Sequence, residues 1–226
     1  MDRRTLLAAV GTTPTITVAG CAGVLGDGRG DCRASGSGGS RTPDADTVAG
    51  HFDGDATRPE CDRDSKTIEF ESRSLDGRKE VETFETAGTI PYPEPPTSFA
   101  CEDVADYVEA FDQAYETHDV LCDREGYPYV TSIADHVSER VAYEWYDDIA
   151  IVVLIRQVGI YSTVFEDGGE GTASAELEGV VYAVDETGAA RAAKSITERT
   201  AVLEVDEFES RAPDPLDRGR LVAAFE

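Results

Sequence analysis

Apolar residues recur at every third or fourth position in the middle of the chain, which is the spacing of one buried helix face. The recurring positions are Val104, Val108, Phe111, Tyr115 and His118. Glu102 and Asp103 stand where a first turn would be, and the helix dipole favours acidic side chains there. The pattern predicts one long helix, which begins near Thr97 or Ser98 and ends near Asp123.

On both sides of this segment the apolar and polar residues alternate instead, as they do in strands. Residues 67–72 and 79–85 predict a hairpin, and the proline-rich stretch 91–96 predicts a stiff extended crossing. The runs 149–155 and 158–165 are apolar on both faces, which favours a buried central position in a sheet. The remaining predicted strands are residues 137–146, 174–184 and 189–194, with an edge strand at 221–225.

Short connections between successive strands imply antiparallel neighbours. One long helix packed on an antiparallel β-meander gives an α+β domain of two layers, which we assign to residues 67–226. Val141, Tyr143 and Trp145 share one strand face, and we expect the helix to cover this stripe as core. The alternative is a ligand pocket between helix and sheet, lined by Tyr143 and Trp145 with His118 as its polar group.

The first 20 residues have the features of an export signal. Arg3 and Arg4 form a twin-arginine pair, and a modestly apolar run follows that is too short and too polar to span a bilayer. Small residues precede Cys21 as in a lipobox, although Val18 stands where leucine is usual. We expect cleavage before Cys21 and a lipid on its sulfur; the alternative is a plain signal peptide with a bystander cysteine.

Residues 21–66 are rich in glycine, serine, aspartate, threonine and arginine, and hold few large apolar residues. Such a composition buries too little apolar surface to offset the entropy of ordering. We therefore predict a flexible, lipid-anchored linker that holds the domain off a membrane.

Four cysteines remain once Cys21 is assigned to the lipid: Cys32, Cys61, Cys101 and Cys122. An even number outside the cell suggests two disulfides. If residues 101–122 form one helix, its end cysteines lie about 31 Å apart, too far for a bridge. Each helix-end cysteine should therefore pair with Cys61 or Cys32, or stay free.

The net charge of the chain is −26, from 46 acidic and 20 basic residues, of which only three are lysines. Binding to nucleic acid or to an anionic membrane surface needs basic patches, so we expect neither as a direct partner. Acidic residues spread along the whole chain, together with so few lysines, are typical of proteins from extreme halophiles, because high salt screens their repulsion. The alternative is an acidic secreted protein from a mesophile.

The usual signatures of hydrolases, nucleotide-binding loops and metal sites are absent from the sequence. His51, His118 and His136 share no ligand spacing with the cysteines, so we predict no metal, no cofactor and no catalytic residue. We expect a membrane-anchored extracellular lipoprotein that acts as a non-catalytic binding or structural domain at the cell surface. The alternative is a small-ligand-binding or enzymatic domain.

The leader, the acidic linker, the helix FACEDVADYVEAFDQAYE and the strand segment VVYAVDETGAAR together resemble a group of haloarchaeal secreted lipoproteins. The resemblance covers roughly residues 90–226 and the leader. The order of a helix followed by a meander also resembles cystatin-like and NTF2-like folds. The cystatin-like resemblance would imply an inhibitor-like module, but neither resemblance supplies a catalytic residue or an activity.

Overall fold

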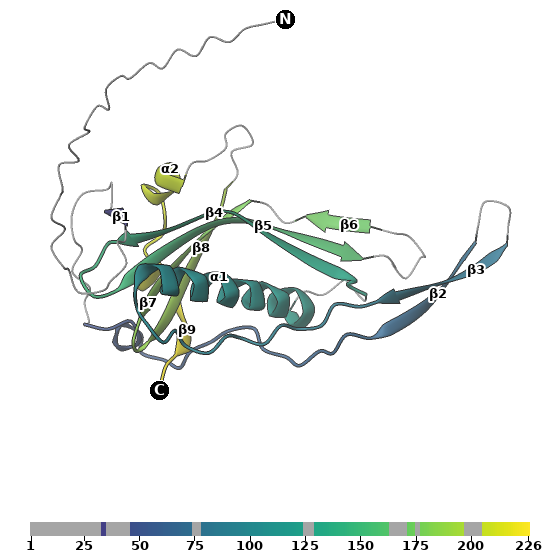
Figure 1. Ribbon diagram of the computed structural model, residues 1–226, viewed down its shortest axis with the longest axis horizontal. Helices are drawn as coiled ribbons and strands as arrows, with labels where there is room; N and C mark the ends of the chain where they lie inside the picture. The colour runs from purple at the N-terminus through teal and green to yellow at the C-terminus, as the bar shows by residue number, and fades with distance from the viewer. Residues whose placement is uncertain are drawn as a thin grey trace, which may run out of the picture.

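The computed structural model describes residues 33–34, 46–73, 78–123, 129–162, 171–174, 177–196 and 205–226. Arg3, Arg4, Cys21 and Cys32 lie outside these residues, as does half of the predicted linker. Within them the chain is an α+β protein, in which one long helix packs on an antiparallel sheet (Figure 1). This is the fold class that the hydrophobic pattern predicts. Among the described residues, no helix has the length and apolar character needed to cross a membrane.

The main sheet has seven strands, and its centre is an antiparallel meander in the order β4-β5-β7-β8-β9. These strands are β4 (Ser132–Glu144), β5 (Ala150–Ser162), β7 (Glu178–Asp185), β8 (Gly188–Ser195) and β9 (Arg220–Ala224). The two-residue strand β1 (Arg33–Ala34) runs parallel to β4, and β6 (Gly171–Ser174) pairs with the last residues of β5. The two apolar runs predicted from the sequence are one central strand, β5, which is buried along most of its length.

Helix α1 (Cys101–His118) crosses one face of this sheet and continues into a π-helical turn, η2 (Asp119–Asp123). The predicted apolar stripe faces the sheet: Val104, Val108 and Phe111 are fully buried and pack against Val152, Leu154, Val180 and Tyr182. Glu102 and Asp103 occupy the first turn and are exposed. The predicted helix is confirmed, and its helical turns end at Asp123 as predicted, but it begins at Cys101 rather than at Thr97 or Ser98.

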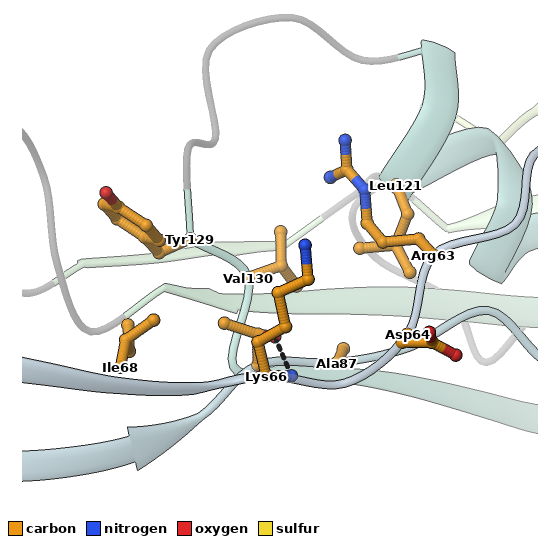
Figure 2. A pocket seen from close by; sticks show the side chains of 9 residues that line it. Arg63, Asp64, Lys66, Ile68, Ala87, Leu121, Tyr129 and Val130 are labelled. Atoms are coloured by element: carbon orange, nitrogen blue, oxygen red, sulfur yellow. Dashed lines mark hydrogen bonds between the residues drawn. The ribbon is translucent and has the colours of Figure 1, made fainter.

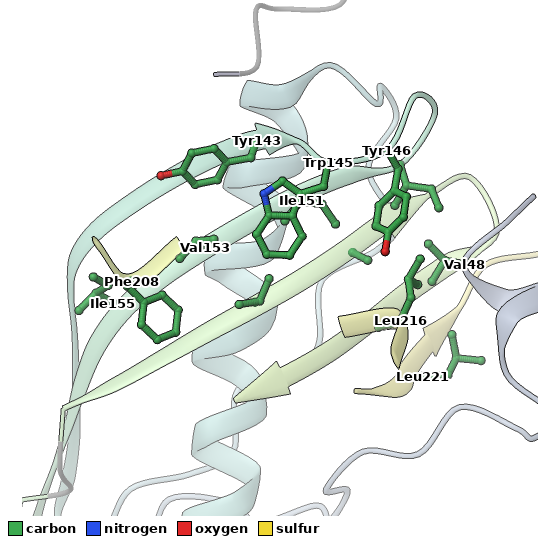
Figure 3. Packing of buried hydrophobic residues seen from close by; sticks show 14 residues of the cluster. Val48, Tyr143, Trp145, Tyr146, Ile151, Val153, Ile155, Phe208, Leu216 and Leu221 are labelled. Carbon is green, nitrogen blue, oxygen red and sulfur yellow. The ribbon is translucent and has the colours of Figure 1, made fainter. Parts of the chain in front are cut away.

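The opposite face of the sheet is covered by α2 (Val205–Glu209), α3 (Pro215–Arg218) and the segment that includes η1 (Ala49–His51) (Figure 3). Val48 is fully buried there, and its N–H donates to Asp185 Oδ2 over 2.8 Å. The predicted end of the linker at residue 66 is therefore wrong, because residues 46–66 belong to the folded domain. The composition of the segment does not indicate that it is folded, because only a few of its residues are apolar.

The predicted hairpin is confirmed as β2 (Thr67–Arg73) and β3 (Lys79–Glu85), but it forms a separate two-stranded sheet. In Figure 1 it projects beyond the end of the main sheet. The chain on either side of it returns to the body, where the N–H of Ala87 donates to the Val130 carbonyl over 2.8 Å. We call residues 63–66 and 86–89, which lie next to each other below the hairpin, the hairpin stem.

Candidate functional site

The three residues of the predicted pocket do not lie together. Tyr143 and Trp145 belong to the core on the face away from α1, where Trp145 Nε1 donates to Glu209 Oε1 of α2 over 3.1 Å. His118 lies at the end of α1, on the other side of the sheet, and stacks on Tyr92. The stripe of Val141, Tyr143 and Trp145 is core, as expected, but α2, α3 and residues 46–52 cover it rather than α1.

The structure instead has a pocket of about 250 Å³ between the hairpin stem, the turn after α1 and the start of β4 (Figure 2). Its apolar lining comes from Leu121 and Val130, which are buried, and from the partly buried Ile68. Tyr129 forms one side and is 41% exposed. We call this the stem pocket.

Hydrogen bonds and a disulfide fix the walls of the stem pocket. Lys66 N–H donates to Thr86 Oγ1, and Thr86 N–H donates back to the Lys66 carbonyl, both over 2.9 Å. The Cys61–Cys122 disulfide ties the chain just before the stem to the turn that carries Leu121, with the two Cα atoms 6.0 Å apart. The positions of the lining residues are therefore set by the fold rather than by a ligand.

Two cations line the stem pocket without a partner among the described residues. The side chains of Arg63 and Lys66 take part in no hydrogen bond or ion pair of the described part of the chain. Asp64 also lies at the rim, but in Figure 2 its side chain points away from Lys66 and Tyr129. Two cations that have no partner among the described residues thus lie beside an apolar floor.

Three arginines that contact α1 are, in contrast, bound to carboxylates. Arg140 Nη1 lies 2.5 Å from Asp106 Oδ1 and 3.0 Å from Glu109 Oε2 on the solvent side of the helix. Arg156 and Arg191 lie beneath the helix, with side chains 1% and 8% exposed. Their positive charges are therefore not available to a ligand.

Asp112 and Glu116 of α1 hold these two buried arginines. Arg156 Nε lies 2.9 Å from Asp112 Oδ2, and Arg156 Nη2 lies 2.5 Å from Glu116 Oε1. Arg191 contacts the same carboxylates at 3.3 and 3.1 Å, and Tyr182 OH donates to Asp112 Oδ1 over 2.6 Å. Each carboxylate thus bridges two guanidinium groups, and we call these five residues the buried ionic network.

Burial and charge pairing have opposite effects on the pKa values of the buried ionic network. Burial alone would lower the pKa of Arg156, but the negative charges of Asp112 and Glu116 outweigh burial and raise it. Burial raises the pKa of Glu116, and Arg156 and Arg191 oppose that rise. The network fits a structural role, because both arginines are buried between helix and sheet and paired with carboxylates, to which Glu178 adds a third beside Arg156 at 2.8 Å. The sequence signal that could have revealed it is an arginine inside each of two apolar strands, at positions 156 and 191.

The cysteine pairing agrees with the helix geometry. Cys122 pairs with Cys61 rather than with Cys101 at the other end of the helix. Cys101 is also disulfide-bonded, and Cys32, a predicted partner for it, lies outside the described residues. The structure also brings His118 next to Cys61 and Cys122, which the sequence spacing does not indicate.

No family model, curated protein or solved structure matches this chain. Its function therefore has to be argued from the geometry of its own sites.

Proposed function

We propose that this chain is an exported, membrane-anchored extracellular domain that binds a small organic anion in the stem pocket and catalyses no reaction. The leader, with Arg3, Arg4 and Cys21, supports export and a lipid anchor. The Cys61–Cys122 disulfide is compatible with an extracellular domain, because disulfides persist in oxidising compartments.

The observation that supports the binding role is an apolar floor beside two cations that have no partner in the described part of the chain. Leu121 and Val130 offer a buried surface for a hydrocarbon group, while Arg63 and Lys66 offer their charges at the rim. Ligand pockets combine mostly apolar walls with a few placed polar groups in this way. The volume of about 250 Å³ fits a short ligand, such as a carboxylate with a small alkyl or aromatic body.

Titration with octanoate tests the pocket, with 1-octanol as the neutral analogue of the same length. We expect octanoate to bind more tightly than octanol in calorimetry at moderate salt. An exposed charge pair contributes roughly 0.2–1 kcal/mol, so Lys66→Gln and Arg63→Gln should each weaken octanoate binding by about 1.5- to 5-fold. Lys79→Gln is the matched control, because Lys79 pairs with Glu71 on the hairpin, outside the pocket. Equal binding of octanoate and octanol would contradict the proposal.

Cell fractionation tests the anchor separately. Cys21→Ser removes the sulfur that would carry the lipid, so the variant should appear in the medium while the parent protein stays with the membrane fraction. Cys101→Ser also removes one cysteine sulfur but leaves Cys21 in place, so this variant should remain with the membrane. Retention of the Cys21→Ser protein in the membrane fraction would exclude a lipid on this residue.

A further inference from the structure

Cys61, Cys122 and His118 meet at the end of α1, although the sequence separates them widely. One ligand atom from each residue lies within 4.8 Å of the other two. The cysteine Cα atoms are 6.0 Å apart, and both cysteines are only partly buried, whereas His118 is 5% exposed. Two thiolates and an imidazole are the ligands that zinc prefers, and three protein ligands leave its fourth position open.

The His118 ring is held in the orientation and tautomer that a metal ligand needs. Nε2 lies 3.0 Å from the Ile90 carbonyl, so its proton is donated there, and Nδ1 accepts a hydrogen bond from the Cys61 N–H over 3.3 Å. Tyr92 stacks on the ring with a centroid distance of 4.8 Å and an interplanar angle of 16°. Metal-binding histidines commonly donate their second ring nitrogen to a backbone carbonyl in this way, which directs the other nitrogen at the ion.

Contacts on both sides of Cys61 would keep it in place without the disulfide. Before it, Tyr92 OH donates to the Pro59 carbonyl over 2.7 Å, and Thr57 N–H donates to the Leu221 carbonyl over 2.9 Å. After it, Thr89 N–H donates to the Arg63 carbonyl over 2.9 Å. Reduction would therefore separate the two sulfurs without releasing the chain that carries Cys61.

We propose that Cys61, Cys122 and His118 form a redox-gated metal site, which is a disulfide when oxidised and a zinc site when reduced. Two molecules of a small thiol transfer two electrons to the disulfide, which becomes two cysteine thiols as the small thiols join in a new disulfide. Zinc then binds both sulfurs and His118 Nδ1, which exchanges its hydrogen bond from the Cys61 N–H for the metal, and the two thiol protons pass to solvent. This proposal does not rest on ligand binding in the stem pocket, although the same disulfide fixes one wall of that pocket.

The experiment compares the oxidised and reduced full chain. The protein is reduced with dithiothreitol, freed of it by gel filtration without oxygen, and titrated with Zn²⁺ and with Co²⁺ as a spectroscopic probe. We expect the reduced protein to show a thiolate-to-cobalt charge-transfer band that the oxidised protein lacks. His118→Ala should weaken Zn²⁺ binding at least tenfold, whereas His136→Ala, on an exposed strand position, should bind as the parent does.

Two further variants separate this site from the other thiols. Cys122→Ser should lose the charge-transfer band, and Cys101→Ser should keep it. Trp145 is the only tryptophan and is 1% exposed, so its unchanged emission reports that the reduced protein stays folded. Equal Zn²⁺ affinity in the parent and His118→Ala proteins would overturn the proposal, and so would a red shift of Trp145 on reduction.

Discussion

At the residue scale, Arg156 shows how a charge is accommodated inside an apolar strand. It follows Ile151 to Ile155 in β5, all of which are buried, and its own side chain is 1% exposed. An ion taken out of water costs several kcal/mol unless it is paired and hydrogen-bonded. Asp112 and Glu116 supply the pairing, while Nη1 of Arg156 has no hydrogen-bond partner within the part of the chain that the structure describes. The helix and the sheet are therefore matched by charge as well as by shape.

Asp135 lies next to this network, and burial raises its pKa. It pairs with Val158 in the β4–β5 register, diagonally across from Arg156, and its Oδ1 is buried with no described partner. Burial raises the pKa of Asp135 from 3.8 to about 6; the charge of Arg156 opposes this rise, and Asp112 and Glu116 reinforce it. The folded protein thus favours the protonated carboxyl more than the unfolded chain does.

Asp135→Asn should therefore remove a pH-dependent loss of stability. In the parent protein the folded pKa is the higher one, so this group costs stability as pH rises from about 4 to about 6. We expect the melting temperature of the variant, relative to the parent, to increase across this interval and to stay constant above pH 7. Asp53→Asn, at an exposed position, is the control and should shift no such curve. A difference that does not change between pH 4 and 7 would rule out this role of Asp135.

At the element scale, much of the fold could be predicted because α1 and most strands have a recognisable apolar pattern. The stripe from Val104 to Tyr115 defines α1, alternation indicates the hairpin and several strands, and a continuous apolar run indicates β5. Helix length alone also excludes a disulfide between the two cysteines at the ends of the helix. These inferences succeed because they depend on local repeats that tertiary packing reinforces.

The sites could not be predicted because they depend on which elements meet. The stem pocket joins residues near 65, 86, 121 and 130, and no period in the sequence connects these positions. The sequence pattern alone places the stripe of Tyr143 and Trp145 under α1, because the short helices and residues 46–52 carry too few apolar residues to indicate that they cover a sheet. A strand with two apolar faces, such as β5, indicates two covering layers but not their identity.

The docking of α2 depends on the absence of a side chain at Gly179. A Cβ atom at this position in β7 would lie 2.1 Å from Phe208 Cζ, so Gly179→Ala must displace Phe208 from its pocket. Burial of such a side chain contributes about 1.5–3 kcal/mol, and we expect that much loss in the free energy of unfolding. Glu209 accepts from Trp145 Nε1, so the displaced helix should also shift the Trp145 emission to the red.

Gly54→Ala is the matched control for this variant, because nothing lies within 4 Å of a Cβ at Gly54. Its unfolding free energy and its tryptophan emission should equal those of the parent. If Gly179→Ala left both quantities unchanged as well, Phe208 would not be the residue that holds α2 on the sheet.

At the scale of the whole molecule, the balance of charge is the dominant property. The chain carries 46 acidic and 20 basic residues, and several of the basic ones are bound in ion pairs with α1. Most of the remaining carboxylates repel one another across the surface, which opposes the compact state. Salt weakens this repulsion between separated charges, because the screening length falls from about 10 Å at 0.1 M to about 3 Å at 1 M. The buried ionic network is enclosed and should be affected much less.

The melting temperature should therefore rise when NaCl is increased from 0.1 to 2 M. Each kcal/mol of relieved repulsion raises the melting temperature of a protein of this size by about 2–4 °C, so several degrees are expected from the net charge of −26. Choline chloride should act as NaCl does, since both screen charge, whereas sucrose at equal osmolality reports the contribution of solute exclusion alone. A melting temperature that responds equally to sucrose and to salt would mean that surface repulsion does not limit the stability of this fold.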